Sequence, residues 1–116
     1  IGADRIVENG DTANKVGSSM LAILAKYYNI PFIVVAPTSS FDMSIKSGED
    51  VEVEFREQKE VLEFRDRMVA PKSSKAWNPS FDITSANHIT AISCEFGMIS
   101  PVSKTNMIKI LQKGEK

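Results

Sequence analysis

The sequence has few of the residues that mark several common classes of protein. It contains a single cysteine, Cys94, which excludes an internal disulfide and fits a reducing, cytoplasmic setting. Its longest apolar run, residues 30–37, is far too short to span a membrane. A net charge of −1 provides no basic surface for a phosphate backbone, so we do not expect nucleic acid as a partner.

Motifs for nucleotide and metal chemistry are missing as well. No glycine-rich P-loop leads to Lys15, and no G-x-G-x-x-G follows the first apolar stretch. The single histidine, His88, has no cluster of ligands beside it, so we expect neither a metal nor another cofactor. His88 and Cys94 are six residues apart on an expected helix, about 120° around its axis, which excludes a nucleophile pair. We interpret His88 as a helix-surface residue and Cys94 as a core or near-core residue.

What is present fits one α/β domain. A chain of 116 residues with 42% hydrophobic residues can bury a core without disulfides. The chain begins without Met, and its first residues are apolar up to Asp4, where polar residues follow. This pattern is typical of the end of a buried strand, so we expect a further segment upstream. We assign residues 1–102 to a Rossmann-like domain truncated on its N-terminal side. Residues 103–116 are expected to form a solvated terminal helix.

Hydrophobic periodicity predicts a strand–helix–strand unit at the start of the chain. Apolar residues recur at helical spacing after the first turn: Val16, Met20, Ile23, Leu24 and Tyr27. They predict an amphipathic helix that buries this stripe, ends at Tyr28 and is capped by Asp11 or Thr12. The apolar run 31–37 predicts a strand covered on both faces. We therefore expect a Rossmann-like parallel sheet flanked by helices, as the C-terminal half of a two-domain protein.

The second half of the chain predicts shorter elements. Alternation at 51–56 is typical of a strand with a solvated acidic face, and residues 57–64 and 68–70 predict a short helix and a short strand. Trp77 is expected to anchor a polar loop onto the domain. A helix over 85–95 is expected to bury three apolar residues: Ile89, Ile92 and Phe96.

Candidate site residues fall where α/β sheets place their ligands, at the carboxyl ends of strands. Asp4 follows an apolar strand, which desolvates its carboxylate, and Lys15 supplies an opposing charge; both suit an acid–base residue. Asn14 and Lys15 at a helix start could bind a phosphate oxygen. Two structural alternatives remain open: Asp4 could pair with Arg5 or cap a turn, and Asn14-Lys15 could be a solvated first turn.

Five segments occur in a fixed order over roughly residues 1–100. They are G-A-D-R-I at 2–6, N-G-D-T-A-N-K-V-G at 9–17, I-P-F at 30–32 leading to A-P at 36–37, D-M-S-I-K-S-G-E at 42–49 and N-P-S-F-D-I-T at 78–84. Together they resemble the signature of the methylthioribose-1-phosphate isomerase family. The superfamily also contains regulatory subunits of the initiation-factor guanine-exchange complex. Segments 9–17 and 42–49 resemble the isomerases more closely than these subunits. Ribose-1,5-bisphosphate isomerases are the closer alternative.

The resemblance implies a function and a set of roles. It implies an aldose–ketose isomerase of methionine salvage that converts 5-methylthioribose 1-phosphate to 5-methylthioribulose 1-phosphate without a cofactor. Asp4 would be the catalytic proton donor, and Asn14 and Lys15 would bind this small sugar phosphate. The family implies a homodimer and a catalytic cysteine upstream, which Cys94 does not match. We therefore expect the chain to need its N-terminal half for activity. The other class of function is a non-catalytic regulatory module.

Overall fold

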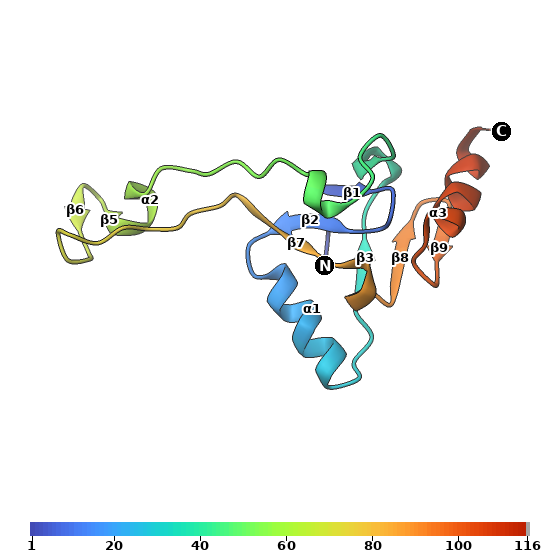
Figure 1. Cartoon of the computed structure of the whole chain (residues 1–116), viewed down its shortest axis with the longest axis horizontal. Coiled ribbons are helices and arrows are strands. Elements are labelled where there is room, and N and C mark those ends of the chain that lie inside the picture. Colours follow the sequence, from blue (N-terminus) through green and yellow to red (C-terminus); the bar gives the residue numbers. More distant parts are fainter. Residues whose placement is uncertain (116) are drawn as a thin grey trace.

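Two small mixed sheets form the body of the domain (Figure 1), in a computed structural model that describes residues 1–115. The first sheet has the strand order β4-β1-β2-β7, with β1 Arg5–Val7, β2 Thr12–Lys15, β4 Phe41–Asp42 and β7 Phe81–Thr84. The second has the order β3-β8-β9, with β3 Ile33–Val35, β8 Ala91–Cys94 and β9 Gly97–Ile99. Helices α1, Ser18–Tyr27, and α3, Lys104–Leu111, flank these sheets. Lys116, the last residue of the expected tail, lies outside the described residues.

Strand directions make both sheets mixed. β1 is parallel to β4 but antiparallel to β2, and β2 is antiparallel to β7. β3 is parallel to β8, which turns back antiparallel into β9. Ile1 lies beside β3. Its amino group donates to the Ile33 carbonyl at 3.0 Å, and the Val35 amide donates to the Ile1 carbonyl at 2.8 Å. The expected α/β class is therefore confirmed, with mixed sheets.

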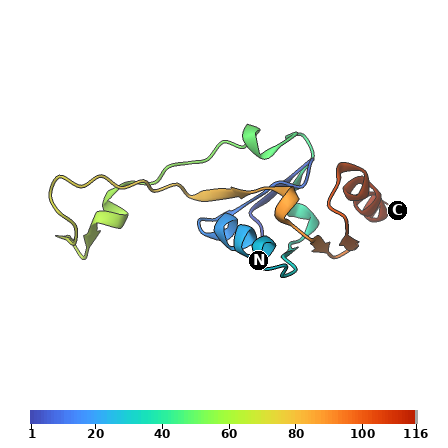
Figure 2. The same ribbon diagram turned by 60° about the horizontal axis from the view of Figure 1, so that its bottom comes forward.

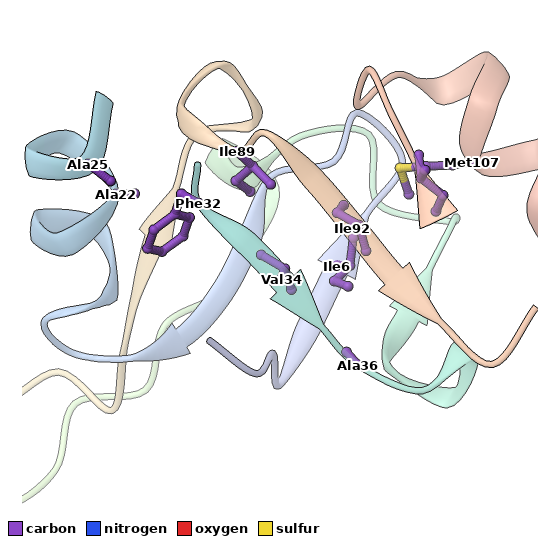
Figure 3. Packing of buried hydrophobic residues seen from close by; sticks show 10 residues of the cluster. Ile6, Ala22, Ala25, Phe32, Val34, Ala36, Ile89, Ile92 and Met107 are labelled. Atoms are coloured by element: carbon purple, nitrogen blue, oxygen red, sulfur yellow. The ribbon is translucent and has the colours of Figure 1, made fainter. Parts of the chain in front are cut away.

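The hydrophobic core lies between the two sheets and beneath α1 and α3. Figure 3 shows Ile6 of β1 near Val34 of β3 and Ile92 of β8, with Met107 of α3 beside the end of the sheet. Its buried members are Ile6, Ala22, Ala25, Phe32, Val34, Ala36, Ile89, Ile92, Ile99 and Met107. Because elements from both ends of the chain contribute to this one cluster, α3 is part of the domain core.

The predicted first helix exists, but its start and its buried face are different. Residues 12–15 form β2 instead of a first helical turn, because they pair with β1 on one side and with β7 on the other. Small residues of α1 are buried against the sheet: Ser18, Ala22 and Ala25. The predicted apolar stripe is exposed, with Tyr27 77% accessible. Small side chains let the helix lie close to β7, and this packing determines which face is buried.

The strand predicted at 31–37 is confirmed as β3, but only one of its faces is covered by described residues. Val34 is fully buried, whereas Val35 is 62% exposed. Residues 85–95 are not a helix: a single 3-10 turn at Ala86–His88 leads into β8. Ile89 and Ile92 are buried as predicted, but through strand pairing with β3, while Phe96 is exposed. Hydrogen bonding between distant segments has overridden the local helical period.

Residues 51–79 form a long arm that extends away from the body (Figures 1 and 2), and the molecule measures 56 × 32 × 23 Å. The two sides of the arm are joined around a β-bridge between Phe55 and Pro79. Beside it the Arg56 amide donates to the Asn78 carbonyl and the Ser80 amide donates to the Glu54 carbonyl, both at 2.8 Å, but the predicted strand at 51–56 does not form a regular ladder. The tip carries the short helix α2, Lys59–Leu62, and a hairpin of β5, Glu63–Phe64, with β6, Arg67–Met68. Trp77 is 75% exposed on this arm, so it does not anchor a loop onto the domain.

The expected terminal helix is confirmed as α3, and one of its faces is packed. Ser103 caps it by accepting a hydrogen bond from the Asn106 amide at 3.2 Å. Met107 is fully buried in the core, so the helix is not wholly solvated. Within the described chain, every helix is too short or too polar to cross a membrane.

The contribution of α3 to the stability of the domain can be measured by truncating Met107. Met107→Ala is expected to lower the free energy of unfolding by about 2–5 kcal/mol, because it leaves a cavity in a closed core. Met98→Ala is the matched control, since Met98 is 58% exposed. Urea denaturation of both variants measures the difference, and equal midpoints would mean that α3 contributes no core contact.

Candidate functional site

Asp4 directly precedes β1, in the short connection that follows Ile1, the residue bonded to β3. Its backbone amide donates to the Ala13 carbonyl at 2.9 Å, which fixes it next to β2. Its side chain is exposed and lines an open cavity of about 230 Å³ together with Arg5, Glu52 and Phe81. The desolvation expected for this carboxylate is therefore not supplied by the described residues. The structure describes no salt bridge between Asp4 and Arg5 in residues 1–115.

Asn14 and Lys15 are the last two residues of β2, not the first turn of a helix. The Asn14 side-chain amide donates to the Ser18 hydroxyl at 2.9 Å, and that hydroxyl donates to the Lys15 carbonyl at 2.7 Å. Lys15 is exposed. Because the Asp4 amide binds the residue that precedes Asn14, the fold brings all three predicted site residues to one end of the β1–β2 pair.

The N-terminus of α1 is occupied by a carboxylate from a distant strand. Asp82 of β7 accepts hydrogen bonds from the Gly17 amide at 2.8 Å and the Ser19 amide at 3.2 Å, both through Oδ2. These two N–H groups are therefore taken up by Asp82, and the predicted phosphate-binding pair, Asn14 and Lys15, lies before the helix that Asp82 caps. The expected caps, Asp11 and Thr12, lie several residues before the helix. Asp82 belongs to segment 78–84, which contributed to the family resemblance, but its role as a cap for α1 was not predicted from the sequence.

Asp11 holds together three segments that are far apart in the sequence. Its Oδ2 accepts from the Gly48 amide and from the Asn9 side chain, each at 2.9 Å. Its Oδ1 accepts from the Ala86 amide at 2.8 Å. Gly48 has to be a glycine here, because an added Cβ would lie 2.4 Å from Ile83 Cγ2. Asp11 is therefore a structural residue that connects segments 9–17, 42–49 and 78–86.

Segment 42–49 also contacts the β1–β2 turn through its backbone. The Glu8 amide donates to the Ile45 carbonyl at 2.9 Å, and the Asn9 amide donates to the Lys46 carbonyl at 3.2 Å. At the start of the segment, the hydroxyl and the amide of Ser44 both donate to the Asp42 carboxylate, which lowers the pKa of Asp42. These bonds keep the segment against the strand that follows Asp4.

The remaining candidates do not form a reactive cluster. Cys94 is half-buried at the end of β8, beside Val35 and Pro37 at the carboxyl end of β3. His88 is half-buried in the 3-10 turn before β8, so the helix on which we placed both residues does not exist. Over residues 1–115, no group of three or more His, Cys, Asp or Glu side chains could hold a metal ion.

Comparison with known proteins gives consistent matches. The model of the initiation factor 2 subunit family matches residues 1–101. A methylthioribose-1-phosphate isomerase of Natranaerobius thermophilus is 51% identical over 107 residues, which are 92% of this chain and 31% of that protein. The chain thus spans about a third of the length of the curated relatives it matches.

Two solved structures share the fold. The crystal structure of 5-methylthioribose 1-phosphate isomerase from Pyrococcus horikoshii is 46% identical with a TM-score of 0.90, covering 97% of this chain and 31% of that one. The structure of translation initiation factor eIF-2B, subunit delta, from A. fulgidus is 39% identical with a TM-score of 0.87, covering 96% and 32%.

Proposed function

Because the chain belongs to the initiation factor 2 subunit family, we propose that it is the C-terminal catalytic part of a methylthioribose-1-phosphate isomerase. The observation that supports this most is the combined likeness in sequence and structure to two proteins that carry the isomerase name. The reaction would convert 5-methylthioribose 1-phosphate to its 1-phosphorylated ketose in methionine salvage. No cofactor is part of the proposal.

In this proposal Asp4 is the acid. The phosphate on C1 blocks the anomeric oxygen, so the sugar ring cannot open by the ordinary loss of the proton of an anomeric hydroxyl group. Asp4 would instead protonate the ring oxygen, so that the bond between this oxygen and C1 breaks and leaves a cation at C1. Loss of the C2 proton to a base, protonation at C1 and loss of the C2 hydroxyl proton would then give the ketose. Asp4 is suited to this step because its side chain faces the cavity of about 230 Å³ and its backbone is held by β2. Asn14 and Lys15, at the same end of the sheet, would bind the phosphate as a donor and a positive charge.

The remaining two thirds of the relatives' length would complete the site. Two apolar surfaces need a covering: the outer face of α1, with Met20, Leu24 and Tyr27, and the outer face of β3, with Val35. We propose that an N-terminal part of the same protein covers one or both and supplies the catalytic cysteine and further substrate ligands. The parallel pair β3–β8 would then belong to a larger Rossmann-like sheet, in a cytoplasmic homodimer.

A complementation assay tests the proposed function. The chain alone is expected to form no ketose from 5-methylthioribose 1-phosphate, whereas the longest natural polypeptide that contains this sequence is expected to turn the substrate over. Co-expression of the chain with the preceding part of that polypeptide should restore activity. If the complete polypeptide is folded and inactive on this substrate, the isomerase assignment is wrong.

Two alternatives give different results in the same assay. A ribose-1,5-bisphosphate isomerase would turn over that bisphosphate in preference to the methylthio sugar, so the ratio of the two kcat/KM values separates them. A regulatory module, favoured by the likeness to the initiation-factor subunit structure, would bind a sugar phosphate or nucleotide without turnover. The residues upstream of Ile1 distinguish it further, because the regulatory module is expected to lack the catalytic cysteine.

A further inference from the structure

Three polar side chains alternate along one face of β7 and of the residue that precedes it. They are Ser80, Asp82 and Thr84, and side chains two residues apart on a strand share a face. Each has a buried oxygen with no hydrogen-bond partner in the part of the chain that the structure describes: Ser80 Oγ, Asp82 Oδ1 and Thr84 Oγ1. A buried polar group without a partner is costly, and Asp82 is the charged member of this row.

Asp82 connects this row to the predicted phosphate-binding pair. In the β2–β7 ladder Asp82 lies directly opposite Asn14, so both side chains are on the same face of the sheet. Asp82 Oδ2 holds the Gly17 and Ser19 amides, and Ser18 between them bonds both the Asn14 side chain and the Lys15 carbonyl. The Asp82 carboxylate is thus connected to Asn14 and to Lys15 through the hydrogen bonds of residues 17–19.

The cap on α1 is unusual because it comes from another strand. Gly17, at the N-cap position, has a φ of 108° and provides no side chain, and the first turn contains no acidic residue. The β2–β7 ladder ends at the pair Lys15–Phe81, so it does not hold the residues that follow Lys15. A local cap would satisfy the same N–H groups without adding a bond from these residues to β7. Asp82, 65 residues away from Gly17, ties that turn to β7.

We propose that Asp82 is a positioning residue for substrate binding: it fixes the turn between β2 and α1 so that Asn14 and Lys15 are presented to the sugar phosphate. This inference rests on the proposed function. Asp82 itself does not touch substrate, because its Oδ2 is used by two backbone amides and its Oδ1 is buried. The charge of Asp82 also keeps the helix terminus from binding the phosphate, so the anion is directed to Lys15.

Steady-state kinetics of the full-length enzyme tests this role. Asp82→Ala is expected to raise KM for 5-methylthioribose 1-phosphate about tenfold and to change kcat less than about twofold, because the phosphate is held alike in substrate and transition state. Asp82→Asn keeps an acceptor oxygen for the two amides and should restore KM to within about threefold of the wild type. Asp50→Ala, at an exposed carboxylate, is the control. A folded Asp82→Ala enzyme with the wild-type KM would overturn the proposal.

A second variant covers the case in which Asp82→Ala does not fold. Ser18→Ala leaves the cap intact but removes the contact between Asn14 and the Lys15 carbonyl. It is expected to raise KM about threefold or more without a change in kcat. An unchanged KM in a folded Ser18→Ala enzyme contradicts the route from Asp82 to the pair.

Hydrogen exchange gives a readout that does not depend on the substrate. In Asp82→Ala the amides of Gly17 and Ser19 should exchange at least about tenfold faster than in the wild type, while β8 stays protected. Unchanged exchange at both amides would refute the positioning role. If the wild-type enzyme does not turn over the sugar phosphate, the proposed function fails, and the exchange result still decides whether Asp82 holds the turn.

Discussion

Asp4→Asn is expected to lower kcat for ketose formation by about 10²–10⁴-fold, which is the usual contribution of a general acid. An asparagine amide cannot donate the proton that opens the ring, although it has nearly the same shape as the acid. The thermal midpoint should stay within a few degrees of the wild type, since the exposed Asp4 side chain makes no described salt bridge and its backbone bond to Ala13 is retained. The assay is turnover of the full-length enzyme at saturating substrate.

Asp66→Asn is the control for this substitution. Asp66 is an exposed carboxylate at the tip of the arm, in the left-handed conformation that asparagine also adopts readily, so its replacement should leave kcat unchanged. A full-length Asp4→Asn enzyme with wild-type kcat would remove Asp4 from the chemistry. It would not affect the assignment of the reaction, which is measured on the wild type.

Asp11→Ala is expected to cost about 3–5 kcal/mol of unfolding free energy. The carboxylate accepts from the Gly48 amide, the Ala86 amide and the Asn9 side chain. Its removal leaves two backbone donors without their partner. Chemical denaturation followed by circular dichroism measures the loss.

Two comparisons show whether this loss comes from the Asp11 hydrogen bonds. Asp11→Asn should lose less, because its amide oxygen still accepts a hydrogen bond, and Asp50→Ala should lose little, because Asp50 is exposed. Equal losses for Asp11→Ala and Asp50→Ala would show that the three segments are held together by other contacts.

Local pattern predicted the kinds of element better than their faces. The apolar spacing from Val16 to Tyr27 indicated a helix, and α1 is there. Periodicity alone assigns the larger apolar stripe to the core, yet the structure buries Ala22 and Ala25 instead. Among the described residues the small face of α1 packs on the sheet, and the larger stripe is the face for which we propose a covering by another part of the protein.

Residues 85–95 illustrate the opposite failure. Ile89 and Ile92 are three residues apart, which suits a helix, but Ile92 is also in the middle of a strand paired with β3. A strand is stabilised by hydrogen bonds to partners distant in sequence, so a short apolar stretch is ambiguous until those partners are known.

The sequence by itself determined the α/β class and the family, because these follow from composition and from residue types in a fixed order, and through the resemblance to that family it proposed a candidate acid and a phosphate-binding pair. Only the tertiary structure decided that Asn14 and Lys15 end a strand, that Asp82 caps α1, and that Asp11 connects three segments. These three features depend on hydrogen bonds between residues up to 75 positions apart. Such bonds form only once whole strands are arranged in the folded protein.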